Sequence, residues 1–418
     1  MPDRRGATVL DDLPDHIVVD KILILLPPKD IGRCRMVRTS WRSATSTPEF
    51  MVEHRRRQPS LPIIDGNRRP ASFVTIRDVA AAGATSQHIW PFRSGRRCGF
   101  LFRASRDGFL IFSPGDRFYI CNPTTRKHAL LPLPCPPRTR SVLDIYIYGL
   151  YQHKSTGEYR VLWSHVHKKE ATLYVLTVGA SESRSIQLVM PTLPSPSLEQ
   201  TYRLSQQLSW TAPVHHCGNL HWLLYRPNLI PGICSTRDDI IVFDTEAESF
   251  RWMRNPANYH ILNRLFEMEG TLAFLGMSVP DRFDNATATA MDVWVMQDYE
   301  AETWAFKYRI DVSMIEASRQ LESASPKERR KRKQPVDSTV RHFSDVDVLN
   351  ERELLVRFNH KHVLRCDIDS KFLGMVTIGK KQYRMKLTGH RIQESIMPIP
   401  SGEMQGEDDE FPFSTEHV

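Results

Sequence analysis

The chain has 418 residues, of which 41% are hydrophobic and 25% are charged, with a formal net charge of +8 at pH 7. This composition is typical of a globular protein, and the length allows a large core beside a smaller module. No run approaches the roughly 20 apolar residues that cross a bilayer, and the N-terminal MPDRRGATVLDDL lacks the apolar segment of a secretion signal. We therefore expect no membrane partner and a location in the nucleus, the cytoplasm or both.

The cysteines also indicate a reducing compartment, because scattered thiols without paired spacing are typical of cytosolic and nuclear proteins. Their number is odd, and no two are spaced as C-x-x-C. They are Cys34, Cys98, Cys121, Cys135, Cys217, Cys234 and Cys366.

Residues 12–50 predict three short helices. Asp12 can cap the first helix, which ends before Pro27-Pro28 because a residue that precedes proline avoids the helical region. A second helix is expected over 31–37, and a third begins near Ser40.

The first of these helices is apolar on every side. At 100° per residue, Ile17 and Ile24 lie opposite the main apolar face, which contains Val18, Val19, Ile22, Leu25 and Leu26. A module of about 40 residues cannot bury apolar side chains all around one helix. The surplus predicts either a partner site or packing on the rest of the chain.

The pattern LPDHIVVDKILILLPPKDIGRCRMV, followed by SWRSATSTPEF, resembles the F-box. That module binds a Skp-family adaptor and, through it, a cullin–RING ubiquitin ligase. The interval from Leu13-Pro14 to Leu26-Pro27 is one residue longer than the commonest form, and Arg38-Thr39-Ser40 replaces the usual Cys-Lys. The resemblance implies adaptor contacts from Leu13, Pro14, Ile17, Ile22, Leu26, Pro27, Ile31, Val37 and Trp41.

A connector is expected to follow this module. The basic residues 54–57 predict a solvated helix end, and Pro59, Pro62 and Pro70 are expected to interrupt regular structure. From about residue 73, short runs rich in aromatic and β-branched residues alternate with turn signals, which predicts strands.

A phrase made of a turn and an apolar strand recurs along this second region. It begins at Asp107, Cys217, Glu269 and Asn350, and a hairpin phrase recurs at 240–253, 293–310 and 362–378. If a polar basic insertion at 316–345 is removed, the spacing becomes about 50 residues or twice that, which is typical of propeller blades. We therefore predict an α+β multidomain protein: a small three-helix F-box, then a mostly antiparallel, propeller-like all-β domain with blades of about 50 residues.

These phrases resemble the F-box-associated region of plant F-box proteins. The resemblance rests on CNPTTRKHALLPLP, GNLHWL, IIVFDTEAESFRWM and VWVMQDYEAETWAFKYRI, and it covers most of 100–380. It implies a β domain that recruits an unknown target protein, for which loops 226–239 and 279–290 are the candidate contacts. The expected segments are a disordered N-terminus (1–8), the F-box (9–55), a connector with first strands (56–95), the β domain (96–395) and a disordered acidic tail (396–418).

The insertion contains six basic residues in a run of seven: Lys327, Arg329, Arg330, Lys331, Arg332 and Lys333. Such a run repels itself and stays in solvent. We interpret it as a nuclear import signal for an importin; a solvated loop and a phosphate-contacting tail are the alternatives.

Chemistry of the chain's own is not expected. His215, His216, Cys217 and His221 cluster, but no second group has zinc spacing. No GxSxG, P-loop, GxGxxG or HExxH motif occurs. The prediction is a non-catalytic, cofactor-free subunit without specific nucleic-acid binding, and the alternatives are a propeller enzyme or a nuclear nucleic-acid-associated regulator.

Overall fold

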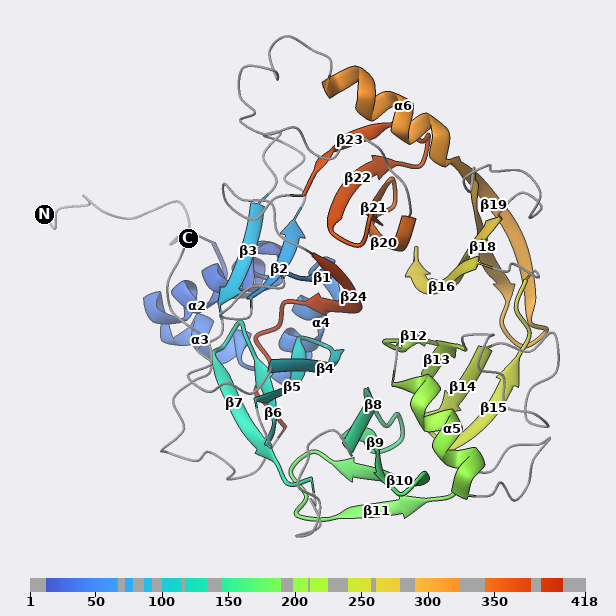
Figure 1. Cartoon of the computed structure of the whole chain (residues 1–418). Helices are drawn as coiled ribbons and strands as arrows, with labels where there is room; N and C mark the ends of the chain where they lie inside the picture. Colours follow the sequence, from blue (N-terminus) through green and yellow to red (C-terminus); the bar gives the residue numbers. More distant parts are fainter. Residues whose placement is uncertain are drawn as a thin grey trace, which may run out of the picture.

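The structure is a computed structural model, shown in Figure 1. It describes residues 13–66, 72–77, 86–91, 100–114, 117–133, 145–188, 198–209, 211–224, 240–256, 261–278, 290–323, 343–376 and 385–400. The predicted import signal, the predicted target loop 226–239 and all but the last residue of the predicted target loop 279–290 lie outside these residues.

The N-terminal helical module, residues 13–57, contains more helical segments than the three predicted from the sequence. Its first helix is divided into α1 (Asp15–Ile17), a π-helical turn η2 (Val18–Ile22) and a 3-10 turn η3 (Leu23–Leu25). Then follow α2 (Pro28–Val37), α3 (Thr39–Thr45) and α4 (Pro48–Arg57). Helix α4, which was not predicted, is the last helix of the module and precedes the first strand.

The π and 3-10 turns explain why the predicted faces of the first helix were partly wrong. Ile24, expected opposite the main apolar face, is 4% exposed, and Leu25, expected on that face, is 65% exposed. A spacing of 100° per residue does not hold across such turns. A π turn also takes up one extra residue, which accounts physically for the longer interval between the two Leu-Pro pairs.

The described residues after this module form six four-stranded antiparallel sheets, which follow one another in chain order. The first sheet has the order β24-β1-β2-β3, with β1 (Ser60–Asp65), β2 (Ser72–Arg77), β3 (Ser86–Pro91) and β24 (Lys386–Gln393). The second has β4 (Phe100–Arg106), β5 (Phe109–Pro114), β6 (Phe118–Asn122) and β7 (Lys127–Leu131). The third has β8 (Ile145–Gln152), β9 (Tyr159–His167), β10 (Glu170–Thr177) and β11 (Ser183–Ile186).

The remaining three sheets are built in the same way. The fourth has β12 (Val214–His216), β13 (Asn219–Leu223), β14 (Ile240–Asp244) and β15 (Ser249–Met253). The fifth has β16 (Ile261–Met268), β17 (Thr271–Ser278), β18 (Ala290–Asp298) and β19 (Thr303–Asp311). The sixth has β20 (Phe343–Asn350), β21 (Glu353–Phe358), β22 (His362–Asp367) and β23 (Phe372–Met375).

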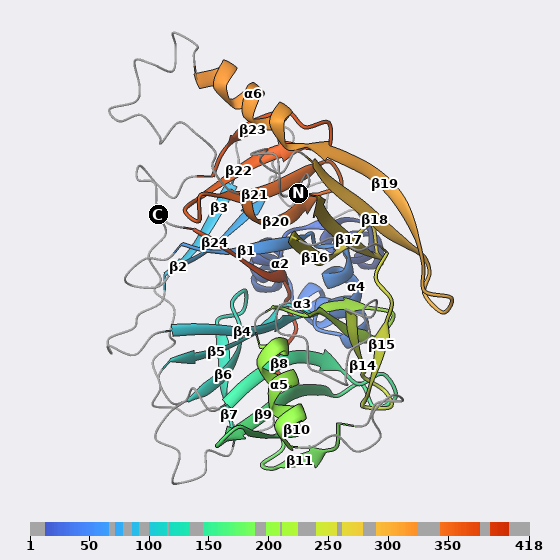
Figure 2. The same ribbon diagram turned by 45° about the vertical axis from the view of Figure 1, so that its right-hand side comes forward.

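The sheets form a ring, and the last strand closes it. In Figures 1 and 2 the sheets follow one another around a common axis, from blue through green to red. The C-terminal β24 pairs antiparallel with the N-terminal β1, with Leu61 opposite Ile392. Apolar clusters fill the space between neighbouring sheets; one of them joins Val293 of β18 to Val346 of β20. The predicted propeller is therefore confirmed.

The recurring sequence phrase marks the second strand of a sheet. Its members become β5, β13, β17 and β21, and the hairpin phrases become β14–β15, β18–β19 and β22–β23. The sheets are unevenly spaced along the chain. The first strands of the second to sixth sheets begin at Phe100, Ile145, Val214, Ile261 and Phe343. The two longest intervals contain helices α5 (Leu198–Leu208) and α6 (Val312–Ser323).

Helix α6 corrects the boundary of the predicted exposed insertion at 316–345. Ile315 and Arg319 of this helix are 1% and 7% exposed, and Ser318 Oγ accepts a hydrogen bond of 3.3 Å from the backbone N–H of Phe372. Residues 316–323 thus belong to a helix packed on the sixth sheet. The other end of the predicted insertion, 343–345, lies in β20.

The limits of the β domain also differ from the prediction. Pro62, expected to interrupt regular structure, lies in β1 opposite Arg391, at a point where the strand register shifts. The propeller therefore begins at Ser60 rather than at residue 96. At the other end, Ile396 is 6% exposed within the core of the helical module, so the predicted disordered tail does not begin there.

Candidate functional site

The helical module exposes apolar side chains near the ends of two of its helical segments. Leu25 of η3 is 65% exposed, and Met36 and Val37 of α2 are 82% and 67% exposed. Among the described residues, these three have the highest exposed fractions of all large hydrophobic side chains. Exposed apolar groups collected on one small module are typical of a protein-binding surface.

The nine residues expected to contact an adaptor fall into three groups. Pro14, Pro27 and Val37 are exposed, whereas Ile31 and Trp41 are 0% and 5% exposed and belong to the module's core. The other four are half-buried: Leu13, Ile17, Ile22 and Leu26. The structure thus brings only part of the expected set to the surface, and it adds Leu25 and Met36, which were not expected there.

The buried members of the pattern hold the helices together. Trp41 Nε1 donates a hydrogen bond to Asp15 Oδ1 at 3.2 Å, which joins α3 to α1. Arg35 donates from Nε to Thr45 Oγ1 at 3.0 Å and from Nη2 to the Thr45 carbonyl at 2.6 Å. Arg35 thereby satisfies a carbonyl at the end of α3, which no helical N–H can reach.

Helix α4 joins the module to the propeller through two buried polar residues. His54 is 0% exposed, and its Nε2 lies 2.7 Å from the Leu26 carbonyl oxygen, so that nitrogen carries the proton and donates. Burial lowers the pKa of His54 and favours the neutral ring. The expectation of a solvated helix end is therefore wrong for His54 and Arg55, whereas the side chain of Arg56 is 69% exposed.

Arg55 makes the direct contact with the propeller. Its Nη1 lies 3.0 Å from Asp107 Oδ2 and 3.1 Å from Tyr159 Oη, and the Tyr159 hydroxyl donates to Asp107 Oδ2 at 2.9 Å. Desolvation raises the pKa of Tyr159, so its hydroxyl remains a donor at neutral pH. One ion pair thus connects α4, the β4–β5 turn and β9.

The C-terminal segment after β24 forms a second connection. Asn122 Nδ2 donates to the carbonyl oxygens of Ser395 at 2.9 Å and Met397 at 2.8 Å, while its Oδ1 accepts from the Thr124 N–H at 3.0 Å. A Cβ placed on Gly108 would lie 2.4 Å from Ser395 Cβ, so the segment passes too close for any other residue at 108. Asn122 and its turn therefore have a structural role in fixing this segment.

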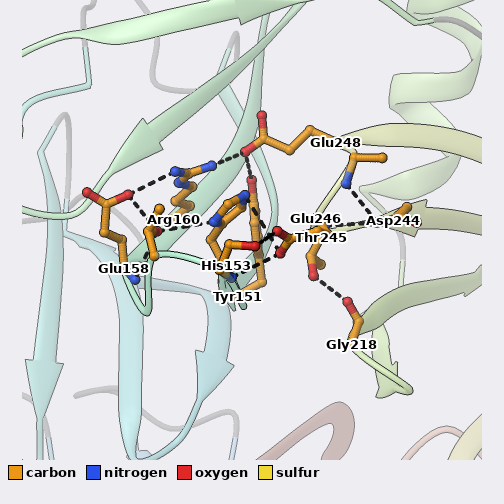
Figure 3. A network of polar contacts seen from close by, with 12 residues as sticks. Tyr151, His153, Glu158, Arg160, Gly218, Asp244, Thr245, Glu246 and Glu248 are labelled. Atoms are coloured by element: carbon orange, nitrogen blue, oxygen red, sulfur yellow. Dashed lines mark hydrogen bonds and ion pairs between the residues drawn. The ribbon is translucent and has the colours of Figure 1, made fainter.

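Ion pairs also link neighbouring sheets. Figure 3 shows the turn between β14 and β15, where Glu248 accepts hydrogen bonds from Arg160 at 2.7 Å and from Tyr151 at 2.9 Å, both in the third sheet. The corresponding Glu302, between β18 and β19, accepts from Arg251 of the fourth sheet at 2.7 Å. The repeated acidic turn thus contacts the preceding sheet.

The four residues of the predicted histidine and cysteine cluster differ in burial. His221 is buried and Cys217 is exposed, while His215 and His216 are half-buried. His221 is bonded to the Val214 carbonyl at 3.1 Å and to Tyr299 Oη at 2.8 Å, and burial lowers its pKa to about 3. In the part of the chain that the structure describes, no group of three or more histidine, cysteine or acidic residues could hold a metal ion.

Two cavities lie at the centre of the ring, with volumes of about 480 and 250 Å³. Their walls are mostly polar. The larger is bordered by Arg55 at the end of α4, by Arg264 of β16 and by Arg391 of β24. Arg55 and Arg56 of α4 border the larger cavity, which therefore lies at the junction with the helical module.

Comparison with known proteins agrees with this architecture. A family model described as the F-box associated beta propeller domain matches residues 84–323. An F-box protein of Arabidopsis thaliana is 24% identical over 334 residues, which are 75% of this chain and 82% of that protein. F-box only protein 8 of the same plant is 24% identical over 269 residues, covering 59% of this chain and 81% of that protein.

Among solved structures, YCF48 from Cyanidioschyzon merolae aligns over 78% of this chain and 87% of its own, at 10% identity and a TM-score of 0.33. The family match is decisive because it spans more than half of the chain and includes all of the second, third, fourth and fifth sheets. The chain belongs to the plant F-box proteins that carry an F-box-associated β-propeller domain.

Proposed function

We propose that this chain is the substrate-recognition subunit of an SCF-type (Skp–cullin–F-box) ubiquitin ligase. The observation that supports this most directly is the exposed apolar surface of Leu25, Met36 and Val37 on a module joined to the propeller by buried contacts. The module binds a Skp-family adaptor, and the propeller holds the target protein for ubiquitination and proteasomal degradation.

The chain contributes proximity rather than bond chemistry. When one protein binds both the ligase and the target, a target lysine is kept at high effective concentration near the ubiquitin thioester. This requires a stable distance and orientation between the two binding surfaces. The Arg55–Asp107 contact and the segment fixed by Asn122 support such a fixed arrangement.

The basic run at 327–333 remains part of this proposal as a nuclear import signal. Six cations in seven residues suit an acidic groove of an importin. Deletion of 327–333 from a fluorescent fusion should lower the nuclear fraction while adaptor binding stays unchanged. An unchanged nuclear fraction would leave the solvated loop or the phosphate-contacting tail.

The proposed function is tested by affinity purification of the tagged full chain from plant cells in which the proteasome is inhibited. The wild-type chain should bring down a Skp-family adaptor, a cullin and at least one ubiquitinated protein. A Met36→Asp/Val37→Asp variant should lose adaptor and cullin but keep the target. If the wild-type chain is recovered without any adaptor, the proposal fails.

A further inference from the structure

The two central cavities share one wall, built by residues from four different sheets. Arg106 at the end of β4, Gln152 at the end of β8, His215 of β12 and Glu267 of β16 border both cavities. These side chains therefore converge on the axis of the ring although they are far apart in sequence. Convergent polar groups in a cavity of this size are typical of a binding site.

Most arginines around the larger cavity are already neutralised. Arg264 pairs with Asp345 and, at 3.2 Å, with Asp347, and Arg391 Nη1 lies 3.4 Å from Asp347 Oδ1. Arg55 is bound to Asp107, as described above. The charge of these three residues is used to hold strands and helices together.

Arg106 is different. Its side chain is 36% exposed, and its Nε lies 3.3 Å from Asp107 Oδ1, a carboxylate that it shares with Arg55. Its Nε lacks a hydrogen bond of good geometry, so the pair with Asp107 is looser than the pairs of Arg55 and Arg264. A guanidinium group that shares its one carboxylate partner with Arg55 therefore borders both cavities.

The neighbours of Arg106 favour a ligand with a single negative charge. Burial and the charge of Arg106 lower the pKa of His215 well below its usual range, so His215 is a neutral ring that can offer one N–H. The exposed Glu267 adds a negative charge to the same wall. It would repel a doubly charged phosphate, but it can accept hydrogen bonds from peptide N–H groups.

We propose that this shared wall binds the C-terminal carboxylate of a peptide from the target protein, with Arg106 holding the carboxylate. A guanidinium group binds a carboxylate through two parallel N–H···O bonds. Glu267 accepts from the last peptide N–H groups, and the larger cavity takes the last side chains. This inference rests on the proposed function, because it names the class of target that the propeller recruits.

The test uses the immobilised full chain and pools of random octapeptides. One pool has a free C-terminal carboxylate, a second is amidated, and a third is amidated and carries an internal phosphoserine. Mass spectrometry of retained peptides should show at least tenfold preference for the free carboxylate. Arg106→Gln should remove that preference, and Arg352→Gln, a 74% exposed arginine that borders neither cavity, should keep it.

Equal retention of the carboxylate and amidated pools by the wild-type chain would overturn the proposal, and this comparison does not depend on the folding of any variant. A preference for the phosphoserine pool would overturn it in favour of phosphate. Glu267→Gln should increase phosphoserine retention and leave the carboxylate preference in place. Adaptor binding is measured on the same preparations, so a failure here with adaptor binding intact leaves the proposed function standing.

Discussion

Arg55 of helix α4 and Asp107 of the β4–β5 turn form an ion pair of 3.0 Å, with only 10% and 8% of their side chains exposed. The pair connects residues from two domains. A buried ion pair is costly to break from one side, because the remaining charge has no partner. The pair lies at the junction between the helical module and the propeller.

Arg55→Ala should therefore destabilise the full chain by about 3 kcal/mol. Chemical denaturation of the purified protein measures this effect. Arg56→Ala is the matched control, because Arg56 is 69% exposed and pairs only weakly with Glu53 at 3.9 Å. If both variants unfold at the same denaturant concentration, the Arg55–Asp107 contact does not stabilise the junction.

We expect stability to fall as the pH drops below about 6.5, because His221 is kept neutral. Its pKa in the folded state is about 3, against 6.5 for an ordinary histidine, so only the unfolded chain binds a proton in between. The stability present above pH 6.5 is lost progressively toward pH 3, and at pH 5 the loss from this one residue is about 2 kcal/mol.

Denaturation at pH 7 and pH 5 checks this expectation. His221→Gln should reduce the difference between the two pH values by about 2 kcal/mol, whatever its effect at pH 7. His54, His215 and His390 act in the same direction, since burial lowers the pKa of each. A variant that shows the full wild-type pH dependence would contradict the role given to His221.

Asn122→Asp should release the C-terminal segment. The aspartate keeps the oxygen that accepts from Thr124, but it loses the donors to Ser395 and Met397 and brings a charge to a position that is 0% exposed. Leaving two buried carbonyls without donors should cost about 2 kcal/mol or more. Limited proteolysis should then cleave near residues 395–400, where the wild-type chain is protected.

Thr124→Ala provides the control for this change, since Thr124 uses its backbone N–H in the turn and a methyl group preserves it. Equal protease resistance of Asn122→Asp and the wild-type chain would show that other contacts hold the segment.

The sequence predicted the features that local chemistry determines. The turns that precede β5, β13 and β17 contain a glycine at positive φ, namely Gly108, Gly218 and Gly270, and such turns favour hairpins regardless of distant contacts. The recurring phrase therefore located equivalent strands, which are the second strands of their sheets.

Features that depend on distant contacts were not predictable in this way. Leu25 and Ile24 exchange their expected surroundings because a π turn precedes them, and no periodicity assumed for an α-helix can anticipate that change. Arg55 is a basic residue in a basic run, and it becomes buried only because Asp107 meets it across the junction. The position of Arg106 likewise depends on distant contacts, because it shares the Asp107 carboxylate with Arg55 of another domain.

The adaptor surface is best tested at residues that do not support the module's core. Leu13 and Leu26 pack partly against that core, so their replacement would change stability and binding together. Met36 and Val37 are largely exposed, and their replacement should affect binding alone. Met314 of α6, which is 57% exposed, offers a matched methionine on a helix of the propeller side.

The central claim is tested most directly by the affinity of the purified full chain for a purified Skp-family adaptor, measured by isothermal titration calorimetry. Met36→Asp/Val37→Asp should weaken binding at least tenfold, about 1.4 kcal/mol, with unfolding unchanged, while Met314→Asp binds like the wild-type chain. Undiminished affinity of the folded double variant would contradict the claim that this apolar surface receives the adaptor.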